Sequence, residues 1–306
     1  MKQEIKNRFC ELLGNGRVLT DEPMSKHTTF RIGGPADYFL APACAEELSQ
    51  ILDICRQEGL EFFILGNGSN LLVSDEGYRG VIIQMYRNYN RIQVEGSIIR
   101  AGAGALLSAV SAAARDASLT GFEFAGGIPG TLGGAVVMNA GAYGGEMKDV
   151  LKEATVMTAQ GEVRTIPAEK LELGYRTSIV KKEGYIVLEA VISLKPGDQH
   201  EIRALMRDLA DRRISKQPLE YPSAGSTFKR PEGYFAGKLI MDAGLRGYQV
   251  GGAMVSEKHC GFVINANGAT ASEVWALMND VKDKVKEKFG VTLEPEVKLL
   301  GNFESF

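Results

Sequence analysis

The sequence has few of the residues from which metal centres and disulfide frameworks are built. Its cysteines and histidines are scattered along the chain: Cys10, Cys44, Cys55, Cys260, His27, His200 and His259. No CxxC pair is present, which argues against structural zinc and against a disulfide framework. No HExxH motif is present either, and an isolated histidine is more often an ordinary surface or core residue than a ligand. We therefore expect no metal, and a reducing compartment.

Strong charge of one sign and long hydrophobic runs are also absent. The net charge of -3 and the pI of about 5.8 give no electrostatic footprint for nucleic acid or an anionic membrane. No apolar run approaches the length of a membrane span. The first residues, MKQEIKNRFCELL, carry charges throughout and do not resemble a signal peptide. We expect a cytoplasmic protein with no nucleic-acid, membrane or obligate protein partner.

Several familiar nucleotide and hydrolase motifs are missing. There is no GxGxxG, so a Rossmann site is unsupported. The segment Gly233–Lys238 is one residue short of a Walker A loop and follows no clear strand. No serine lies in a GxSxG context, so a serine hydrolase is not indicated.

The most conspicuous segment that is present is Gly121–Glu146, GFEFAGGIPGTLGGAVVMNAGAYGGE. It is dense in glycine, contains repeated Gly-Gly pairs, and has no charged residue from Phe124 to Gly145. A flexible linker would instead be rich in Ser, Lys and Glu. Glycine among apolar residues indicates backbone held close to a flat or anionic partner, with N–H groups turned toward it. The alternative is a set of tight turns in a buried core.

A second glycine turn lies earlier in the chain. The apolar strand expected at Phe62–Leu65 runs into Gly66–Asn70, and Leu71–Val73 reads as the next strand. Such a turn presents several N–H donors and side-chain amides at one point.

The remaining pattern predicts an α+β fold, because strands and short helices follow one another without regular alternation. A first helix is expected from the helical spacing of Ile5, Phe9 and Leu12, and Gly14–Gly16 ends it. Further expected helices are 45–58, 105–117, 199–216, 235–244 and one that opens at Thr270–Glu273, which have capping-box spacing, and that Gly290 ends. Expected strands include 81–85, 91–94, 98–101, 150–158 and 162–166 as a hairpin about Gln160-Gly161, 186–194, 261–265 and 297–300. The polar segment Ser25–Gly34 is expected to be extended. Ile202, Leu205, Met206 and Leu209 are expected to face a core. Pro196-Gly197-Asp198 is the best boundary, which predicts domains 1–197, with two subdomains divided near 85–95, and 198–306.

Three polar segments outside the expected core carry chemistry-bearing residues. They are Gly174–Ser178 with Arg176, Ser223–Arg230 with Ser226 and Lys229, and Glu294–Val297 with Glu296. An arginine in such a turn can clamp a carboxylate or phosphate through two hydrogen bonds. Each segment taken alone is equally well a solvated loop.

Taken together and in this order, these segments resemble the UDP-N-acetylenolpyruvoylglucosamine reductase family, and the resemblance covers essentially the whole chain. The segments that carry it are His27–Gly34, Leu65–Leu72, Gly126–Gly134, Asn139–Gly144, Gly174–Ser178, Ala224–Lys229 and Glu294–Val297. Seven collinear motifs make this a specific match.

The resemblance implies an FAD-binding domain of the vanillyl-alcohol-oxidase (PCMH) type followed by a C-terminal α+β substrate-binding domain. The cofactor-binding residues that it implies are Gly66, Asn67, Gly68, Ser69, Asn70, Leu71, Gly127, Ile128, Pro129, Gly130, Thr131, Gly133, Gly134, Asn139, Gly141 and Ala142. Neither glycine-rich segment contains a histidine or cysteine, so FAD is expected to be bound non-covalently.

The chemistry that the resemblance implies has two half-reactions. NADPH delivers hydride to the flavin, and flavin N5 then passes it to C3 of the enolpyruvyl ether of UDP-N-acetylglucosamine, giving UDP-N-acetylmuramate for peptidoglycan. Arg176 and Glu296 would stabilise the charge that develops at C2, and Ser226 would protonate C2. Lys216 and Lys229 are implied to lie near the substrate.

The family has two classes, one of which carries an extra tyrosine-bearing loop. Only about ten residues separate Arg176 from the strand expected at Ile186, so we expect the shorter class, without that loop. Two alternatives remain: another FAD-dependent oxidase or dehydrogenase of the same fold, and a non-enzymatic nucleotide-binding module. Neither needs the AGSTFK and EPEV segments.

Overall fold

The computed structural model describes residues 2–303, which form two compact units. The first unit contains the chain up to Thr20 together with Tyr38–Asn67 and Gly80–Arg213. The second contains Asp21–Asp37, Gly68–Arg79 and the chain from Ile214 onward. The units thus combine segments from both halves of the sequence. The sequence predicts an FAD-binding domain at 1–197 and a substrate-binding domain at 198–306. This division by ligand stays a prediction.

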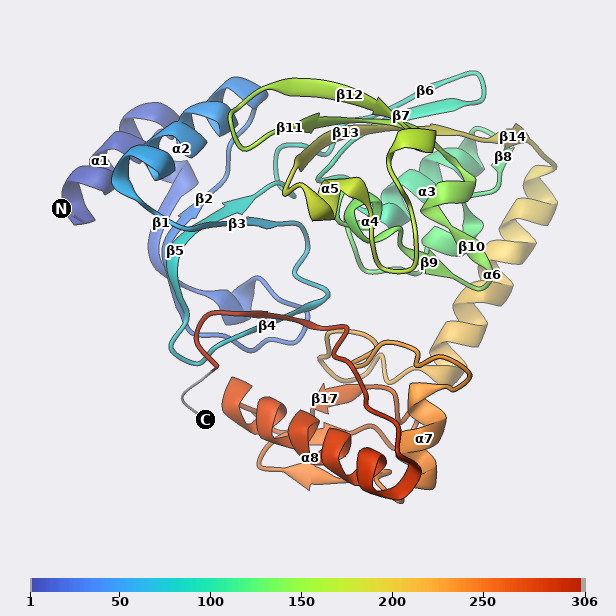
Figure 1. Cartoon of the computed structure of the whole chain (residues 1–306). Helices are drawn as coiled ribbons and strands as arrows, with labels where there is room; N and C mark the ends of the chain where they lie inside the picture. The colour runs from blue at the N-terminus through green and yellow to red at the C-terminus, as the bar shows by residue number, and fades with distance from the viewer. Residues whose placement is uncertain (1, 304–306) are drawn as a thin grey trace. The chain divides into compact units, whose positions relative to one another are not determined.

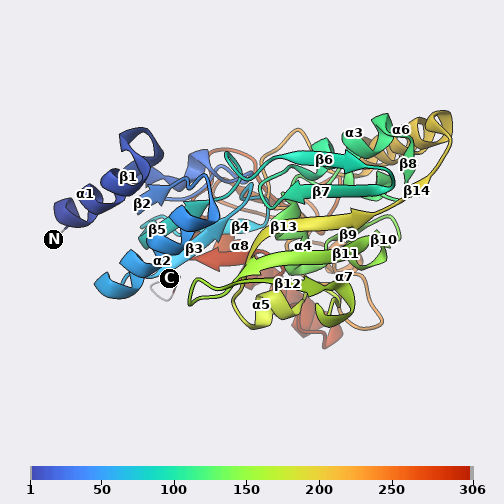
Figure 2. The ribbon, with the colours of Figure 1, turned by 90° about the horizontal axis from the view of Figure 1, so that it is seen from above.

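A five-stranded antiparallel sheet is the centre of the first unit, in the order β12-β11-β13-β7-β6. Figure 2 shows these strands side by side. Their bounds are β6 Ile92–Glu95, β7 Ile98–Gly102, β11 Leu151–Met157, β12 Val163–Pro167 and β13 Ile186–Ser193. The hairpin predicted about Gln160-Gly161 is confirmed, and Gly161 adopts the positive φ of 86° that the turn needs.

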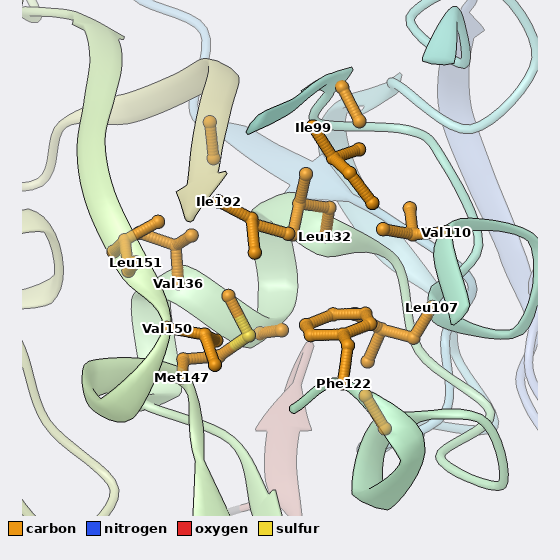
Figure 3. Packing of buried hydrophobic residues seen from close by; sticks show 14 of the residues in the cluster. Ile99, Leu107, Val110, Phe122, Leu132, Val136, Met147, Val150, Leu151 and Ile192 are labelled. Carbon is orange, nitrogen blue, oxygen red and sulfur yellow. The ribbon is translucent and has the colours of Figure 1, made fainter. Parts of the chain in front are cut away.

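Helices α3 (Leu107–Asp116) and α4 (Leu132–Met138) pack against this sheet. Figure 3 shows the core that they close, in which Phe122 lies near Leu107 and Met147. The labelled members of this core are almost fully buried: Ile99, Leu107, Val110, Phe122, Leu132, Val136, Met147, Val150, Leu151 and Ile192. Each such side chain contributes about 1.5–3 kcal/mol when it is removed from water. The core therefore gives the loops beside α4 a rigid support.

Helices α1 (Lys2–Leu13) and α2 (Ala45–Glu58) of the first unit lie side by side in Figure 1. Strand β3 (Phe62–Leu65) pairs in parallel with β5 (Tyr78–Gln84) in a sheet of order β1-β2-β5-β3. The two other strands are β1 (Val18–Pro23) and β2 (Pro35–Leu40). Gly59 ends α2 in the left-handed conformation.

The second unit is built on α8 (Ala271–Phe289), whose apolar face packs on a three-stranded sheet. The capping box predicted at Thr270–Glu273 is confirmed: Glu273 N donates to Thr270 Oγ1 at 3.1 Å, and Thr270 N donates to Glu273 Oε2 at 3.0 Å. Further elements of this unit are α7 Ala236–Asp242, β15 Gln249–Val250, β16 Ala253–Val255, β17 Val263–Asn265, and β18 Lys298–Leu300, which pairs in parallel with β4 Leu71–Val73.

The remaining elements are short, apart from α6. They are η1 Asn15–Arg17, η2 Met24–Lys26, β8 Leu119–Thr120, η3 Glu123–Ala125, β9 Gly141–Ala142, β10 Gly145–Glu146, η4 Met147–Asp149, η5 Ala168–Lys170, α5 Ile179–Lys182, β14 Lys195–Pro196 and α6 Gln199–Lys216. No helix within residues 2–303 combines the length and the apolar character that crossing a bilayer requires.

Two local predictions are wrong. Helix α6 has the predicted bounds, but of the four apolar positions predicted to face a core only Ile202 is buried, and Leu205 is 44% exposed. The helix is dominated by charged residues, and its pattern is too weak to bury a face. Residues 25–34 are not extended, because η2 begins at Met24 and Arg31 has a φ of 57°.

Candidate functional site

The two glycine-rich segments meet in the first unit. The side-chain amide of Asn67 donates to Pro129 O at 2.7 Å. A Cβ placed on Gly66 would lie 2.4 Å from Thr131 Oγ1, so no other residue fits there without movement. The turn after β3 and the loop before α4 are therefore in direct contact, although about sixty residues separate them in sequence.

The loop before α4 is held against the end of β7. Leu107 N donates to Gly130 O at 3.1 Å, and Leu132 N donates to Ala105 O at 2.8 Å. Gly133 N donates to Ala103 O at 2.8 Å, and a Cβ on Gly133 would lie 2.8 Å from Ala103 Cβ. These bonds fix the position at which α4 begins.

Several glycines of this region are required by the protein itself. A Cβ on Gly141 would lie 2.7 Å from Gly145 O, and one on Gly145 would lie 2.6 Å from the Phe124 ring. Like Gly66 and Gly133, these two glycines are needed because other parts of the protein pack closely against them, as the alternative of tight turns in a buried core predicts. A high glycine content is therefore weaker evidence for a ligand than the sequence suggested. Gly134 differs: it is exposed, and its Cβ would meet only Thr131 Oγ1, at 3.7 Å.

The start of α4 presents unused hydrogen-bond donors. Within residues 2–303, no acceptor is bonded to the backbone N–H groups of Gly127, Gly130, Thr131 and Gly134, and Thr131 provides no side-chain cap. Such N–H groups, together with the partial positive charge of a helix start, suit an anion. This arrangement fits a cofactor diphosphate.

Arg213 of α6, which sequence reasoning missed, lies against the same loop. Its Cδ and Nη1 are 3.2 and 3.3 Å from the position of a Cβ on Gly127. Burial lowers the pKa of this guanidinium, and the only opposing influence is Tyr143. No carboxylate of the described residues pairs with it. No local pattern marks Arg213, because it stands among several charged residues of the same helix.

Two buried polar atoms near these segments have no hydrogen-bond partner among the described residues. They are Gln84 Oε1 and Ser111 Oγ. Gln84 is in register with Leu65, the residue before Gly66. Ser111 Oγ lies 3.0 Å from the position of a Cβ on Gly126. Because buried polar atoms are normally bonded, both are compatible with a polar ligand beside the two turns.

Arg176 occupies a tight turn elsewhere in the first unit. Gly174 N donates to Thr177 O at 3.1 Å, and Thr177 N donates to Gly174 O at 3.2 Å. Arg176 has a φ of 57°, which is uncommon for arginine. Its guanidinium carbon lies 5.2 Å from the centre of the exposed Tyr175 ring. Non-glycine residues in this backbone region often mark functional sites.

Asn139 ends α4 in the left-handed conformation and is 2% exposed. Its side-chain nitrogen donates to Glu146 Oε2 at 2.5 Å and to Gly174 O at 3.3 Å, and its oxygen accepts from Lys148 N at 2.9 Å. The amide is thus fully engaged within the protein. The contact with FAD expected for Asn139 stays a prediction.

In the second unit, the motif segments are joined one to the next. Thr29 N donates to Gly68 O at 3.2 Å, and Thr29 Oγ1 donates to Ser223 O at 2.7 Å. The Asn70 side chain donates to Glu296 O at 3.1 Å. Glu296 N in turn donates to Thr227 O at 2.9 Å. Four segments that are far apart in sequence therefore converge.

Ser226 is placed by this network. It is exposed and precedes Thr227, which is buried and accepts from Val263 N through Oγ1 at 2.8 Å. Because Thr227 also accepts from Glu296 N, the Ser226 and Glu296 backbones are held close together. Arg176 belongs to the first unit.

The two lysines differ in their surroundings. Lys229 N donates to Glu294 O at 2.8 Å, and its ammonium pairs with Glu294 Oε2 at 2.9 Å. This pairing lowers the pKa of Glu294. Lys216 is exposed at the end of α6. The structure brings Lys229 to the segment that carries Glu296, whereas Lys216 has no comparable contact among the residues that the structure describes.

Two family models match the chain. One, described as an FAD binding domain, matches residues 36–167, and the other, described as the C-terminal domain of UDP-N-acetylenolpyruvoylglucosamine reductase, matches residues 217–300. With the observed mixture of helices and strands, these matches confirm the predicted α+β class and the predicted pair of domain types.

Relatives of known name match over nearly the whole chain. A UDP-N-acetylenolpyruvoylglucosamine reductase from Lachnoclostridium phytofermentans is 56% identical, covering 98% of this chain and 96% of the relative. One from Clostridioides difficile is 50% identical, covering 98% of each. The crystal structure of the reductase from Thermus caldophilus superposes with a TM-score of 0.80 at 36% identity, covering 92% of this chain and 98% of that one.

Proposed function

Because the chain belongs to the UDP-N-acetylenolpyruvoylglucosamine reductase family, we propose that it reduces the enolpyruvyl ether of UDP-N-acetylglucosamine to UDP-N-acetylmuramate with NADPH. The reaction serves peptidoglycan synthesis. The strongest structural support for the proposal is the contact between the two turns expected to bind FAD, where the Asn67 side chain donates to Pro129 O at 2.7 Å. A sequence match alone does not require this contact.

The FAD diphosphate is assigned to the start of α4. The N–H groups of Gly127, Gly130, Thr131 and Gly134 have no partner within the described residues and point to an anion there. Arg213 adds a half-buried positive charge that no described carboxylate neutralises. Bound FAD would supply the hydride-transfer chemistry between NADPH and the vinyl carbon of the substrate. The absence of His and Cys from both turns supports non-covalent binding.

The substrate step is assigned to three residues. Arg176 and the Glu296 carboxyl group act on the carboxylate end of the enolpyruvyl group, where negative charge develops as hydride arrives at C3. Ser226 donates the proton to C2. The support is local: Ser226 is exposed at the edge of a rigid network, and its neighbour Thr227 bonds to Glu296 N. A serine hydroxyl is a weak acid, so the proton transfer depends on its being held close to C2.

The two lysines are proposed to bind the UDP-sugar. Lys229 is the better supported, because it pairs with Glu294, two residues from Glu296. The reaction is assigned to the cytoplasm because it needs NADPH. All four cysteines are free thiols in the described residues, which agrees with a reducing compartment.

The Ser226→Ala variant tests the proposal in stopped flow. NADPH should bleach its flavin at nearly the wild-type rate, since no proton at C2 is needed in that step. Recolouring by enolpyruvyl-UDP-N-acetylglucosamine should slow by about 10²–10⁴-fold. Ser223→Ala removes a hydroxyl from the same loop and should leave both steps unchanged. Equal loss in both steps of Ser226→Ala would refute the assigned role.

A further inference from the structure

We propose that Asn139 and Ser178 form a brace that holds the Arg176 turn against the end of α4, and that both are positioning residues for Arg176. The inference rests on the proposed function of Arg176. It gives Asn139 a role different from the direct FAD contact that its motif suggested.

The backbone and the hydrogen bonds of Asn139 fix its side chain in one orientation. Its backbone is left-handed, with a φ of 44°, which asparagine tolerates better than most residues. This conformation ends α4 and turns the amide so that its nitrogen reaches both Glu146 Oε2 and Gly174 O. Lys148 N donates to the amide oxygen, which fixes its orientation. Asn139 therefore links α4 to a carbonyl of the Arg176 turn.

Ser178 supplies a second link between the same two elements. Its hydroxyl, 0% exposed, donates to Val137 O in α4 at 2.8 Å and accepts from Lys181 N at 3.3 Å. One link thus lies at each end of the turn, at Gly174 and at Ser178. Two hydrogen bonds from opposite ends leave the turn little freedom to shift relative to α4.

The turn needs such support because of its backbone. Arg176, at φ 57°, is held in a conformation that costs of order 1 kcal/mol or more for a residue with a Cβ. It persists only where the surroundings impose it. The bonds between Gly174 and Thr177 close the turn, but they do not fix where it lies. The brace connects it to α4, whose start is the expected diphosphate site.

Glu146 accepts a hydrogen bond from Asn139 and also interacts electrostatically with Arg176. Its carboxylate accepts from Asn139 and pairs with Lys148 at 2.8 Å. The hydrogen bond from Lys148 lowers its pKa most, and the Asn139 bond and the positive charges of Lys148 and Arg176 act in the same direction. An anion is therefore maintained on the side of the turn to which Asn139 is bonded. The anion that orients Asn139 also attracts Arg176.

The test is a double-mutant cycle on the holoenzyme. Asn139→Asp keeps the shape and the left-handed tolerance but replaces both donors with an acceptor and places a second carboxylate beside Glu146, and Asn139→Gly removes the side chain without adding a charge. Ser178→Ala cuts the second link with a small change in volume. Each is made alone and with Arg176→Ala. Glu123→Gln is the control, since Glu123 is a buried carboxylate of the same unit that accepts from Thr120 Oγ1 and Gly121 N.

We expect both Asn139 variants to slow flavin recolouring by substrate about 10–100-fold, as a small misplacement of a catalytic group does. Ser178→Ala should give a smaller loss in the same step. Flavin content and bleaching by NADPH should stay within about threefold of wild type. With Arg176→Ala already present, the Asn139 and Ser178 changes should add little, because they act through Arg176. Glu123→Gln should leave recolouring unchanged.

Other outcomes overturn the inference in distinguishable ways. A full additional loss in the Arg176→Ala background means that the brace acts independently of Arg176. Loss of flavin from the Asn139 variants, with recolouring normal in the molecules that retain it, means that Asn139 is an FAD contact. Normal recolouring in Ser178→Ala and both Asn139 variants, with Arg176→Ala impaired, removes the brace and leaves the proposed function intact. If Arg176→Ala itself recolours normally, the role of Arg176 fails, and the brace fails with it.

Discussion

The Gly134→Ala variant tests whether this position must be glycine because a ligand lies against it or because the protein packs against it. Gly134 lies in α4, and its φ is not positive. A Cβ there would be exposed and would contact only Thr131 Oγ1, at 3.7 Å, which is an ordinary van der Waals distance. Nothing within residues 2–303 therefore opposes the methyl group. Only a molecule lying against the start of α4 would do so.

The expected effects on stability and on binding have opposite signs. Alanine within a helix is about 0.5–1 kcal/mol more favourable than glycine, so the flavin-free protein should melt slightly higher. A methyl group inserted between α4 and a tightly packed cofactor should cost about 1–3 kcal/mol. At 1.4 kcal/mol for each tenfold change, FAD should bind roughly 5–150-fold more weakly.

Gly66→Ala provides the contrast, because its Cβ would lie 2.4 Å from Thr131 Oγ1. This variant should be less stable even without FAD. Adding Thr131→Ala removes the obstructing oxygen and leaves a Cβ contact at 3.5 Å, so the double variant should recover stability. No such partner change should restore FAD binding to Gly134→Ala.

The assay is a thermal melt of the flavin-free protein together with a titration that follows quenching of FAD fluorescence. A Gly134→Ala protein that binds FAD as tightly as wild type would refute the placement of FAD against α4. A Gly134→Ala protein that is destabilised without FAD would show that the protein itself requires this glycine.

Two further predictions concern charge. Arg213→Gln should weaken FAD binding about 10–100-fold, since a hydrogen bond to a charged group is worth about 1.5–3 kcal/mol; an FAD titration that matches wild type would contradict it. Burial lowers the pKa of His259, so the unfolded chain binds more protons below about pH 6.5. The stability that this group contributes is present above that pH and is lost as the pH falls through the lowered value of the folded state. His259→Asn keeps an acceptor for Gly261 N and should reduce the fall in melting temperature between pH 7.5 and 5.5, whereas an unchanged fall would exclude His259 as its source.

The elements with strong hydrophobic periodicity were predictable from the sequence. Helix α2 has the predicted bounds, Ala45–Glu58, because its apolar positions fall on one face and Gly59 ends it. The capping box of α8 was also predictable, because it depends only on the spacing of Thr270 and Glu273. Helix α4 was missed, since two glycines among seven residues give it a poor helix propensity. Tertiary bonds to residues 103–107 support it instead.

The candidate site was predictable as a set of segments but not as a set of contacts. Nothing local indicates that Asn67 reaches Pro129, or that Asn70 and Thr227 both bond to Glu296. Arg213 was invisible for the same reason, because its position against Gly127 comes from the packing of α6. The hydrogen bonds of the Asn139 amide to Glu146, Gly174 and Lys148 were equally unpredictable, because they join residues that only the fold brings together.

The central claim, that this chain is an FAD enzyme transferring hydride from NADPH to an enolpyruvyl-UDP-sugar, is tested most directly by the colour of the purified protein in anaerobic stopped flow. NADPH should bleach the flavin absorbance, and enolpyruvyl-UDP-N-acetylglucosamine should restore it with formation of UDP-N-acetylmuramate. The flavin should be released on denaturation. Bleaching that only oxygen reverses, with no response to the UDP-sugar, would contradict the claim and indicate an oxidase of the same fold.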